Sequence, residues 1–296
     1  MYLLPLTQQV PWHIAAITAA KWAVYDGFRA AIADADLPPG EAGVIADERS
    51  CAPILRDAAA HGLTTVCTVG RASDAGFEGV AAHASTCEAT YWKTVVSYNP
   101  DGDAVSNGRQ ASRLMWLSEC RSHRPQPRLM CDLVVPPTQV QLTSGIRAYG
   151  RRMLPGLTKR AIGQLLDAGV DPDVWVIEGF ERQEEYREVA KTAARGGRLT
   201  QSLVRAAGHS DSTTRDLMSV GLSVPGILGV VLPRAPFWES AAAWMSGRTT
   251  RAVAVATVRA QVRDWVSALE EPASFPIAAA RTEPAAAVTA VSNPAL

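Results

Sequence analysis

"YWKTVVSYNPDGD", residues 91–103, begins as a run that reads as a buried β-strand, and a stretch with helical spacing follows it at 107–123. The run carries Lys93 near its start. An ammonium group in an apolar strand lies at the strand end, snorkels to water, is paired, or takes part in chemistry. The number of times that this strand–helix unit recurs predicts the fold, and the fold in turn predicts where a functional site would lie.

Short apolar, β-branched runs recur along the chain and predict eight strands. They are "YLLPL" (2–6), "GVIAD" (43–47), "LTTVCTV" (63–69), "WKTVVSY" (92–98), "RLMCDLVV" (128–135), "DVWVIE" (173–178), "SLVRAA" (202–207) and "ILGVVL" (227–232). Helical patterns cover 14–35, 51–61, 107–123, 155–168, 181–195, 211–221, 236–246 and 250–269, with a weaker pattern at 75–88.

Strands that alternate with helices pair in parallel through right-handed crossovers, and eight such units are the number at which a sheet closes. We therefore predict an α/β fold, a single-domain (β/α)8 TIM barrel over residues 1–271, with an open doubly wound sheet as the alternative. Residues 272–296 are rich in Ala and Pro without sustained periodicity, which predicts a flexible C-terminal tail. Parts of it could dock or mediate a subunit contact.

Composition narrows the function classes. The chain has 296 residues, of which 47% are hydrophobic, and 29 basic residues balance 29 acidic ones. Such a chain can bury a large core. Zero net charge and the lack of a basic cluster with interleaved aromatics argue against nucleic acid and against an anionic membrane surface as partners.

No apolar run approaches the roughly 20 residues that span a bilayer, and the N-terminus lacks the features of a signal peptide, so we expect a cytoplasmic protein. The five cysteines lack CxxC spacing and are odd in number. This predicts small core residues or reduced thiols rather than a disulfide framework or a zinc site. We expect no metal and no cofactor.

Polar residues at the carboxyl ends of barrel strands are the candidates for chemistry, since packed side chains fill the interior below them. Asp47, Glu48 and Arg49 follow the second predicted strand. They could also cap and pair locally at the start of the next helix. Lys93 shares a strand face with Tyr91. If that face points into the barrel, desolvation favours a neutral amine that can act as a base or an imine-forming nucleophile.

Two carboxylates accompany this lysine. Asp132 lies inside "LMCDLVV", and Glu178 closes "DVWVIE". Each needs a cation or hydrogen bonds, and Lys93 is an available partner, so a purely structural ion pair competes with a catalytic role. His209, after the seventh strand, is a candidate general acid or base, although a capped turn before the next helix is the simpler account. Arg234, after the eighth strand, suits a phosphate or carboxylate, or is a surface arginine between prolines.

Several segments together resemble, in order, the class I aldolase family of bacterial 5-keto-2-deoxygluconate 6-phosphate aldolases. More distantly they resemble tagatose-bisphosphate and sulfosugar-phosphate aldolases. The segments are "YLLPLTQQVPW", "AAKWAVYDGFRAAI", "AGVIADERSCAPIL", "WKTVVSYNPDGD", "GVDPDVWVIEG" and "GVVLPRAPFWESAAAWMSGRTTRAVAVATVRAQVRDWV". The resemblance covers about residues 1–270 and implies a barrel that acts on phosphorylated keto sugars through a Schiff base.

The chain departs from this family at three places. The family's strand-six lysine, in W-W-K-L-E-P or V-L-K-V-E, is Val176 here, and valine cannot form an imine. The Asp-His-Arg motif after strand one aligns with residues 7–9, which places Gln8 as a substrate-binding candidate. The glycine beside the family's phosphate arginine is Pro233, which removes one backbone N–H.

Other positions of the family pattern persist. Residues 47–49 match its acidic-arginine motif, Lys93 matches its second strand lysine, and Asp132 stands where glutamate is usual. Glu178 matches its strand-six glutamate, and Arg234 matches its phosphate arginine. The resemblance implies that Lys93 faces the pocket. By strand alternation, Val176 and Glu178 share one face.

Three hypotheses of function remain open. The first is a diverged C–C lyase for a small, anionic carbonyl or sugar-phosphate-like compound. In it Lys93 forms the imine, Glu178 and Asp132 transfer protons with Asp47 and His209 as further candidates, and Arg234, Arg49 and Gln8 bind substrate. The second is an isomerisation, dehydration or cyclisation by acid–base chemistry without an imine. The third is a non-catalytic barrel that binds a ligand or a partner, and a homo-oligomer is compatible with all three.

Overall fold

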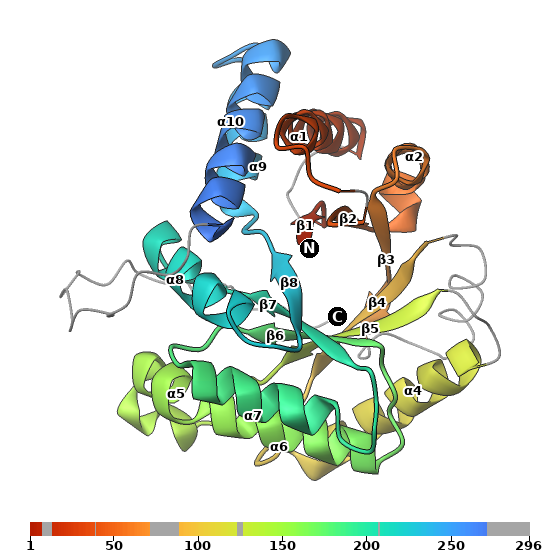
Figure 1. The fold of residues 1–296 in the computed structure, drawn as a ribbon, viewed down its shortest axis with the longest axis vertical. Coiled ribbons are helices and arrows are strands. Elements are labelled where there is room, and N and C mark those ends of the chain that lie inside the picture. The colour runs from red at the N-terminus through yellow and green to blue at the C-terminus, as the bar shows by residue number, and fades with distance from the viewer. Residues whose placement is uncertain (8–13, 39, 72–88, 123–126, 207, 271–296) are drawn as a thin grey trace.

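Eight parallel strands pair in chain order into a closed barrel in the computed structural model of this protein (Figure 1). The structure describes residues 1–7, 14–38, 40–71, 89–122, 127–206 and 208–270, without the side chains of residues 14, 48–50, 70, 71, 121 and 122. The strands are Tyr2–Pro5 (β1), Ala42–Ala46 (β2), Thr64–Arg71 (β3), Tyr91–Ser97 (β4), Arg128–Val134 (β5), Val174–Glu178 (β6), Gln201–Arg205 (β7) and Ile227–Val231 (β8).

Closure of the sheet decides between the two predicted folds. β1 pairs with β2 on one side and with β8 on the other, where Leu3 lies opposite Val231. An open doubly wound sheet would leave two free edges. The predicted (β/α)8 TIM barrel is therefore confirmed, and the open-sheet alternative is wrong.

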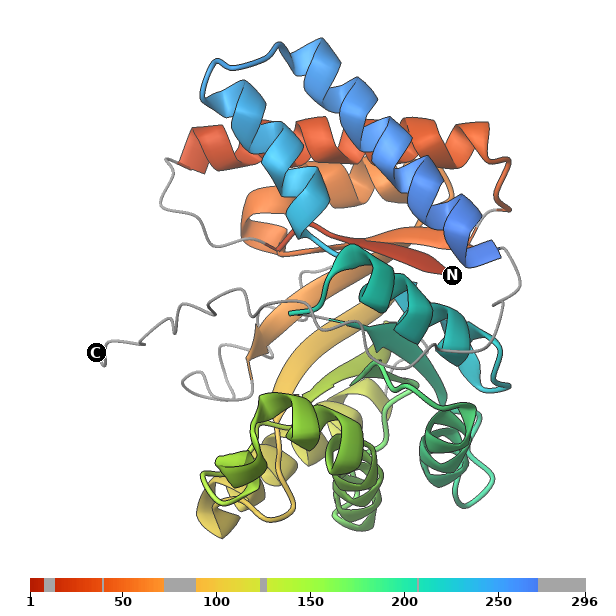
Figure 2. The same cartoon turned by 90° about the vertical axis from the view of Figure 1, so that its left-hand side faces the viewer.

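Helices surround the barrel on its outer face. They are Ile14–Asp34 (α1), Glu48–Ala60 (α2), Ala104–Ser122 (α4), the 3-10 turn Gln141–Ser144 (η1), Ile146–Arg152 (α5), Leu154–Asp167 (α6), Gln183–Ala193 (α7), Asp211–Leu222 (α8), Ala235–Met245 (α9) and Arg251–Glu270 (α10). Figures 1 and 2 show α9 and α10 alongside α1 on one side of the barrel, with α4, α6 and α7 on the opposite side.

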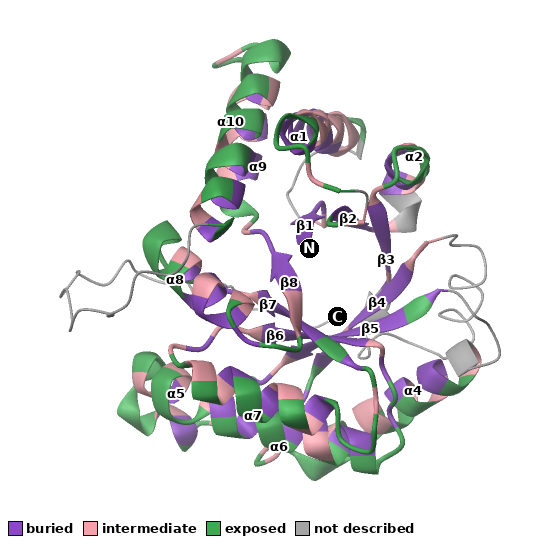
Figure 3. Ribbon diagram, in the orientation of Figure 1, coloured by how far each residue is buried: buried purple, intermediate pink, exposed green. Residues whose placement is uncertain are grey.

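The strands separate two apolar cores, and Figure 3 shows them as mostly buried. The inner core takes residues from every strand: Leu3, Ile45, Val66, Tyr91, Met130, Val174, Val176, Leu203 and Val231. The alternate positions of the same strands, such as Trp92 and Trp175, pack outward against the helices. The inward-facing positions nearer the carboxyl ends of the strands are left for polar side chains.

Two helices begin three residues before their predicted starts, and two short elements were not predicted. The helix predicted at 51–61 begins at Glu48, because the backbone N–H of Cys51 already donates to the carbonyl oxygen of Asp47 at 3.0 Å. The helix predicted at 107–123 begins at Ala104. η1 and α5 were not predicted at all, since their short segment shows no sustained periodicity. The weaker pattern at 75–88 and the predicted tail at 272–296 lie outside the described residues.

The cysteines correct one expectation. Cys51 and Cys131 are buried, as expected of small core residues, but Cys67 of β3 is disulfide-bonded. The expectation of a reduced thiol is therefore wrong for Cys67. An odd count excludes only the pairing of all five residues, and sequence spacing does not report which side chains meet in space.

Barrel closure near the amino ends of the strands depends on Gly43 of β2. A Cβ at this position would lie 2.3 Å from the carbonyl oxygen of Thr64 and 2.9 Å from a methyl group of Leu3. We predict that Gly43→Ala lowers the free energy of unfolding by roughly 1–3 kcal/mol, because the backbone of the neighbouring strand cannot yield. Urea unfolding followed by circular dichroism measures the change.

Gly156 of α6 is the matched control. A Cβ there would meet no heavy atom within 4 Å, so Gly156→Ala should stabilise the helix by about 0.5–1 kcal/mol. Equal stability of Gly43→Ala and the wild-type protein would contradict the described packing of β1, β2 and β3.

Candidate functional site

An ion pair lies inside the barrel between β4 and β5. The Nζ atom of Lys93 is 2.6 Å from Oδ2 of Asp132, and both side chains are nearly buried, with 9% and 11% of their surface exposed. The prediction that Lys93 faces the barrel interior is therefore confirmed, and the snorkelling alternative is wrong.

Arg205, at the end of β7, extends this pair into a network of four charged side chains. Its Nε donates to Oδ1 of Asp132 at 2.9 Å, its Nη1 donates to Oε2 of Glu178, and its Nη2 donates to the carbonyl oxygen of Leu133 at 3.3 Å. Two cations and two anions therefore alternate in the order Lys93, Asp132, Arg205, Glu178. We call these four residues the inner charge network.

Strand alternation places the network. Met130, Val176 and Leu203 belong to the inner core, so residues two positions further along their strands, Asp132, Glu178 and Arg205, face inward as well. Glu178 and Arg205 are direct neighbours in the register of β6 and β7. The side chains of Arg205 and Glu178 are about one-fifth exposed, twice as much as those of Lys93 and Asp132. The network thus runs from the interior toward solvent.

Electrostatics favour the ionised forms of Asp132 and Arg205. Burial alone would raise the pKa of Asp132, but the Lys93 ammonium and the Arg205 guanidinium together hold it below its ordinary value. Burial would likewise lower the pKa of Arg205, and the carboxylates of Asp132 and Glu178 raise it instead. Asp132, in contact with both cations, is the central member.

Val176 of β6 is the residue that the sequence resemblance aligns with an imine-forming lysine. It is fully buried in the inner core and lies opposite Asp132 in the register of β5 and β6. Val176 therefore contributes apolar packing next to the network. Lys93 is the lysine that the described residues place inside the barrel.

Asp47 forms an ion pair with Lys21, a residue outside the inner charge network. Its Oδ2 accepts from Nζ of Lys21, in α1, at 2.8 Å, and Cys51 of α2 also lies near that oxygen. Lys21 is 2% exposed. These contacts direct the Asp47 carboxylate toward the surrounding helices.

His209 and Arg234 lie in turns after β7 and β8. His209 is exposed. The next residue, Ser210, caps α8 by accepting from the backbone N–H of Thr213, as the capped-turn alternative predicts. Arg234 is exposed and donates from Nη1 to the carbonyl oxygen of Thr7 at 2.8 Å, which ties the turn after β8 to the end of β1.

Three candidates cannot be placed. Gln8 lies outside the described residues, and so do the side chains of Glu48 and Arg49. The predicted roles of Gln8 and Arg49 in substrate binding therefore stay predictions, as does the membership of Glu48 in the cluster at 47–49.

Sequence reasoning missed Arg205 and Lys21. Arg205 satisfies the positional rule that selected Glu178, because it is the last residue of a barrel strand. Lys21 stands in the apolar stretch "ITAAKWAV" of α1, where the argument about buried charge that was applied to Lys93 applies equally.

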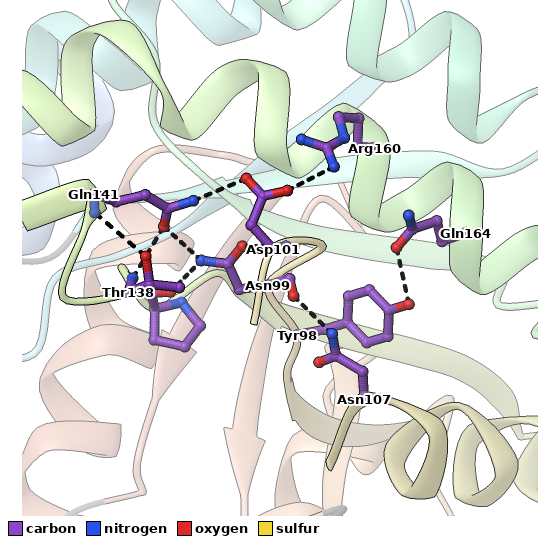
Figure 4. Close-up of polar contacts among 9 residues, drawn as sticks. Tyr98, Asn99, Asp101, Asn107, Thr138, Gln141, Arg160 and Gln164 are labelled. Atoms are coloured by element: carbon purple, nitrogen blue, oxygen red, sulfur yellow. Dashed lines mark hydrogen bonds and ion pairs between the residues drawn. The ribbon is translucent and has the colours of Figure 1, made fainter. Parts of the chain in front are cut away.

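A second polar cluster fixes the loops after β4 and β5, as Figure 4 shows. Nδ2 of Asn99 donates to the carbonyl oxygen of Pro136 and to Oε1 of Gln141, both at 2.7 Å. Gln141 in turn donates to Asp101, which also accepts from Arg160 of α6 at 2.7 Å. The "YNPDGD" stretch therefore joins the ends of the two strands that carry Lys93 and Asp132.

The chemistry available to the network is proton transfer and carbonyl polarisation. An amine beside a carboxylate can exchange a proton with it, and a second carboxylate linked through a guanidinium can serve a different atom of the same ligand. Among the described residues, no group of three or more His, Cys, Asp or Glu side chains is arranged to hold a metal ion. Within the same ranges, no helix is both long and apolar enough to cross a bilayer.

Comparisons with known proteins give matches among solved structures and concern the fold. No protein-family model and no curated protein matches the sequence. A solved protein of Corynebacterium glutamicum is 13% identical with a TM-score of 0.51, over 89% of this chain and 85% of that one. The fructose-bisphosphate aldolase of Slackia heliotrinireducens is 11% identical with a TM-score of 0.46, over 82% and 78% of the two chains.

The dihydrodipicolinate synthase of Thermotoga maritima is 11% identical with a TM-score of 0.46, over 90% of this chain and 81% of that one. At such identities the likeness concerns the barrel fold alone. The inner charge network is therefore interpreted from its own geometry.

Acid should weaken the network. Because the folded-state pKa of Asp132 is lowered, its ionisation stabilises the fold above the unfolded-state pKa of about 4, and this contribution is lost as pH falls through the folded-state pKa. We predict that Asp132→Asn lowers the free energy of unfolding at pH 7 by roughly 3–5 kcal/mol, since two cations lose their shared anion. The variant should also lose less stability than the wild-type protein on acidification below pH 4.

Glu188→Gln is the control, because Glu188 forms an exposed ion pair with Lys159 at 2.6 Å and should change stability little at pH 7. Denaturant unfolding at a series of pH values measures both variants. A pH dependence of Asp132→Asn that matches the wild-type profile would contradict the assignment.

Proposed function

We propose that this barrel is an aldolase-like lyase that acts on a small, anionic carbonyl compound, with Lys93 as the imine-forming amine. The observation that carries the proposal is the inward-facing Lys93 ammonium, 2.6 Å from a carboxylate that can take its proton. A buried ion pair contributes little net stability compared with apolar packing, so stability alone gives weak grounds for keeping four charges in a barrel.

The proposed reaction begins when the Lys93 ammonium gives a proton to Asp132. The free amine adds to the substrate carbonyl, and loss of water, with a proton returned by Asp132, gives a protonated imine. The C–C bond between the carbon next to the imine carbon and the following carbon then breaks. Its electron pair moves into the imine and leaves an enamine. Glu178 accepts the proton of the hydroxyl group that becomes the new carbonyl. Protonation of the enamine and hydrolysis then release the second product and restore Lys93.

The other members of the site have supporting roles in this proposal. Arg205 binds both Asp132 and Glu178 and so holds the two carboxylates at a fixed separation. Arg234 lies in the turn after β8 and suits the anionic group of the substrate. Gln8 and Arg49 remain candidates for the same anionic end, and Asp47 and His209 remain candidates for proton transfer.

A second candidate function is acid–base catalysis without an imine, as in an isomerisation, dehydration or cyclisation. The contact between Lys93 and Asp132 supports this imine-free function, because it pairs an ammonium group with a carboxylate. An ammonium that keeps its proton polarises a carbonyl oxygen, while Asp132 or Glu178 removes a proton from the adjacent carbon. Reductive trapping separates the two functions.

The chain is well suited to such trapping, because it contains only four lysines: Lys21, Lys93, Lys159 and Lys191. We predict that sodium borohydride with dihydroxyacetone phosphate or pyruvate attaches one substrate-derived group to Lys93, located by mass spectrometry of peptides. Lys93→Arg keeps the positive charge beside Asp132 but lacks a primary amine, so it should show no label.

Lys21→Arg is the matched control, because Lys21 is also buried and paired with a carboxylate at 2.8 Å, yet lies on α1 outside the barrel. Its labelling should equal that of the wild-type protein. Turnover that survives borohydride without labelling would favour the imine-free function. Label that persists in Lys93→Arg would overturn the role of Lys93, and a tightly bound anion without turnover would indicate a non-catalytic barrel.

A further inference from the structure

Thr68 of β3 lies beside Lys93 on the inner face of the barrel. Val66, two residues earlier, belongs to the inner core, so strand alternation points Thr68 inward too. Thr68 and Lys93 are direct partners in the register of β3 and β4. Neighbouring strands lie about 4.7–4.9 Å apart, so the two side chains leave adjacent positions on one surface.

The hydroxyl group of Thr68 has no partner among the described residues. Its Oγ1 atom is buried and makes no hydrogen bond within the described part of the chain. Most buried side-chain polar atoms in folded proteins are hydrogen-bonded, and an unsatisfied one destabilises the fold. An unpaired hydroxyl beside a charged network therefore calls for an explanation.

The neighbouring threonines show that the strand can satisfy such groups. Oγ1 of Thr65 accepts from the backbone N–H of Thr90 at 3.0 Å and lies 3.3 Å from the Thr90 hydroxyl. Oγ1 of Thr64 donates to the carbonyl oxygen of Gly40 at 3.4 Å. Thr68, which is nearer the carboxyl end of the barrel, is the exception among the threonines in this strand.

The ammonium group of Lys93 can also donate further hydrogen bonds. It carries three N–H donors, and Asp132 is the partner that the described residues give it. An oxygen atom placed beside the amine could accept from Lys93 and, at the same time, accept from or donate to Thr68.

We propose that Thr68 is a substrate-binding residue that hydrogen-bonds an oxygen of the bound carbonyl compound beside Lys93. The oxygen is that of the carbonyl group or of a hydroxyl on the adjacent carbon. This inference rests on the proposed function for the location of the ligand, and Thr68 is not a member of the inner charge network.

Thr68→Val tests the proposal because valine keeps the shape of threonine and removes only the hydroxyl group. In the free protein the substitution removes an unsatisfied polar atom, so the melting temperature should stay the same or rise. Binding of dihydroxyacetone phosphate, and of pyruvate, measured by titration calorimetry, should weaken about tenfold. Thr68→Ser, which keeps the hydroxyl, should bind as the wild-type protein does.

Ser202→Ala is the matched control. Ser202 of β7 is also fully buried with an unpartnered hydroxyl, but it pairs in register with Trp175 on the outer face of the barrel. Its substitution should leave probe binding unchanged, so an effect confined to Thr68→Val would reflect position rather than the general loss of a hydroxyl.

The outcomes separate this inference from the proposed function. Binding that weakens in Thr68→Val without imine trapping at Lys93 would support the role of Thr68 and reject the imine. Trapping at Lys93 with unchanged binding in Thr68→Val would keep the proposed function and overturn this inference. A fall of about 2–4 °C in the melting temperature of Thr68→Val would show a structural role and also overturn it. Failure of the wild-type protein to bind either probe would overturn both.

Discussion

The contact of Asp132 with both Lys93 and Arg205 is the constraint on which the candidate site depends. Each of these charges, taken alone, would cost several kcal/mol to bury, and only mutual pairing makes their position tolerable. Asp132 supplies one oxygen to each cation, at 2.6 Å and 2.9 Å. Glu178 then balances the second cation. Removing any one member leaves the other three with an unbalanced charge, so the four residues act as one unit.

The rest of the barrel is built around this unit. Below it, an apolar inner core that includes Val176 fills the space between the strands. At its edge, Asn99 and Gln141 join the loops that follow β4 and β5. Outside the barrel, Lys21 and Asp47 form a separate pair between α1 and the end of β2. Together these features hold the ends of several strands in a fixed arrangement, as carbonyl chemistry with several groups requires.

Much of this arrangement follows from sequence alone. Eight strand–helix units predicted the closed barrel. Alternation along β4 predicted which residues share a face with Lys93, and the family resemblance predicted that this face points inward. The pairing within the network did not follow, because Lys93 could have met Asp132 or Glu178, and only the register between strands decides. Arg205 was missed although its position at a strand end obeyed the rule already in use. Short elements such as η1 and α5, and the disulfide at Cys67, depend on contacts that no local pattern records.

The central claim is that Lys93 is a ligand-facing amine and not a structural cation. Nuclear magnetic resonance of protein labelled only at lysine tests it most directly, because four side chains give four signals and Lys93→Arg assigns one of them. The account predicts that dihydroxyacetone phosphate or pyruvate shifts the Lys93 signal and leaves those of Lys21, Lys159 and Lys191 in place. A Lys93 signal that is unmoved by either compound would contradict it and would leave the inner charge network a structural feature of the barrel.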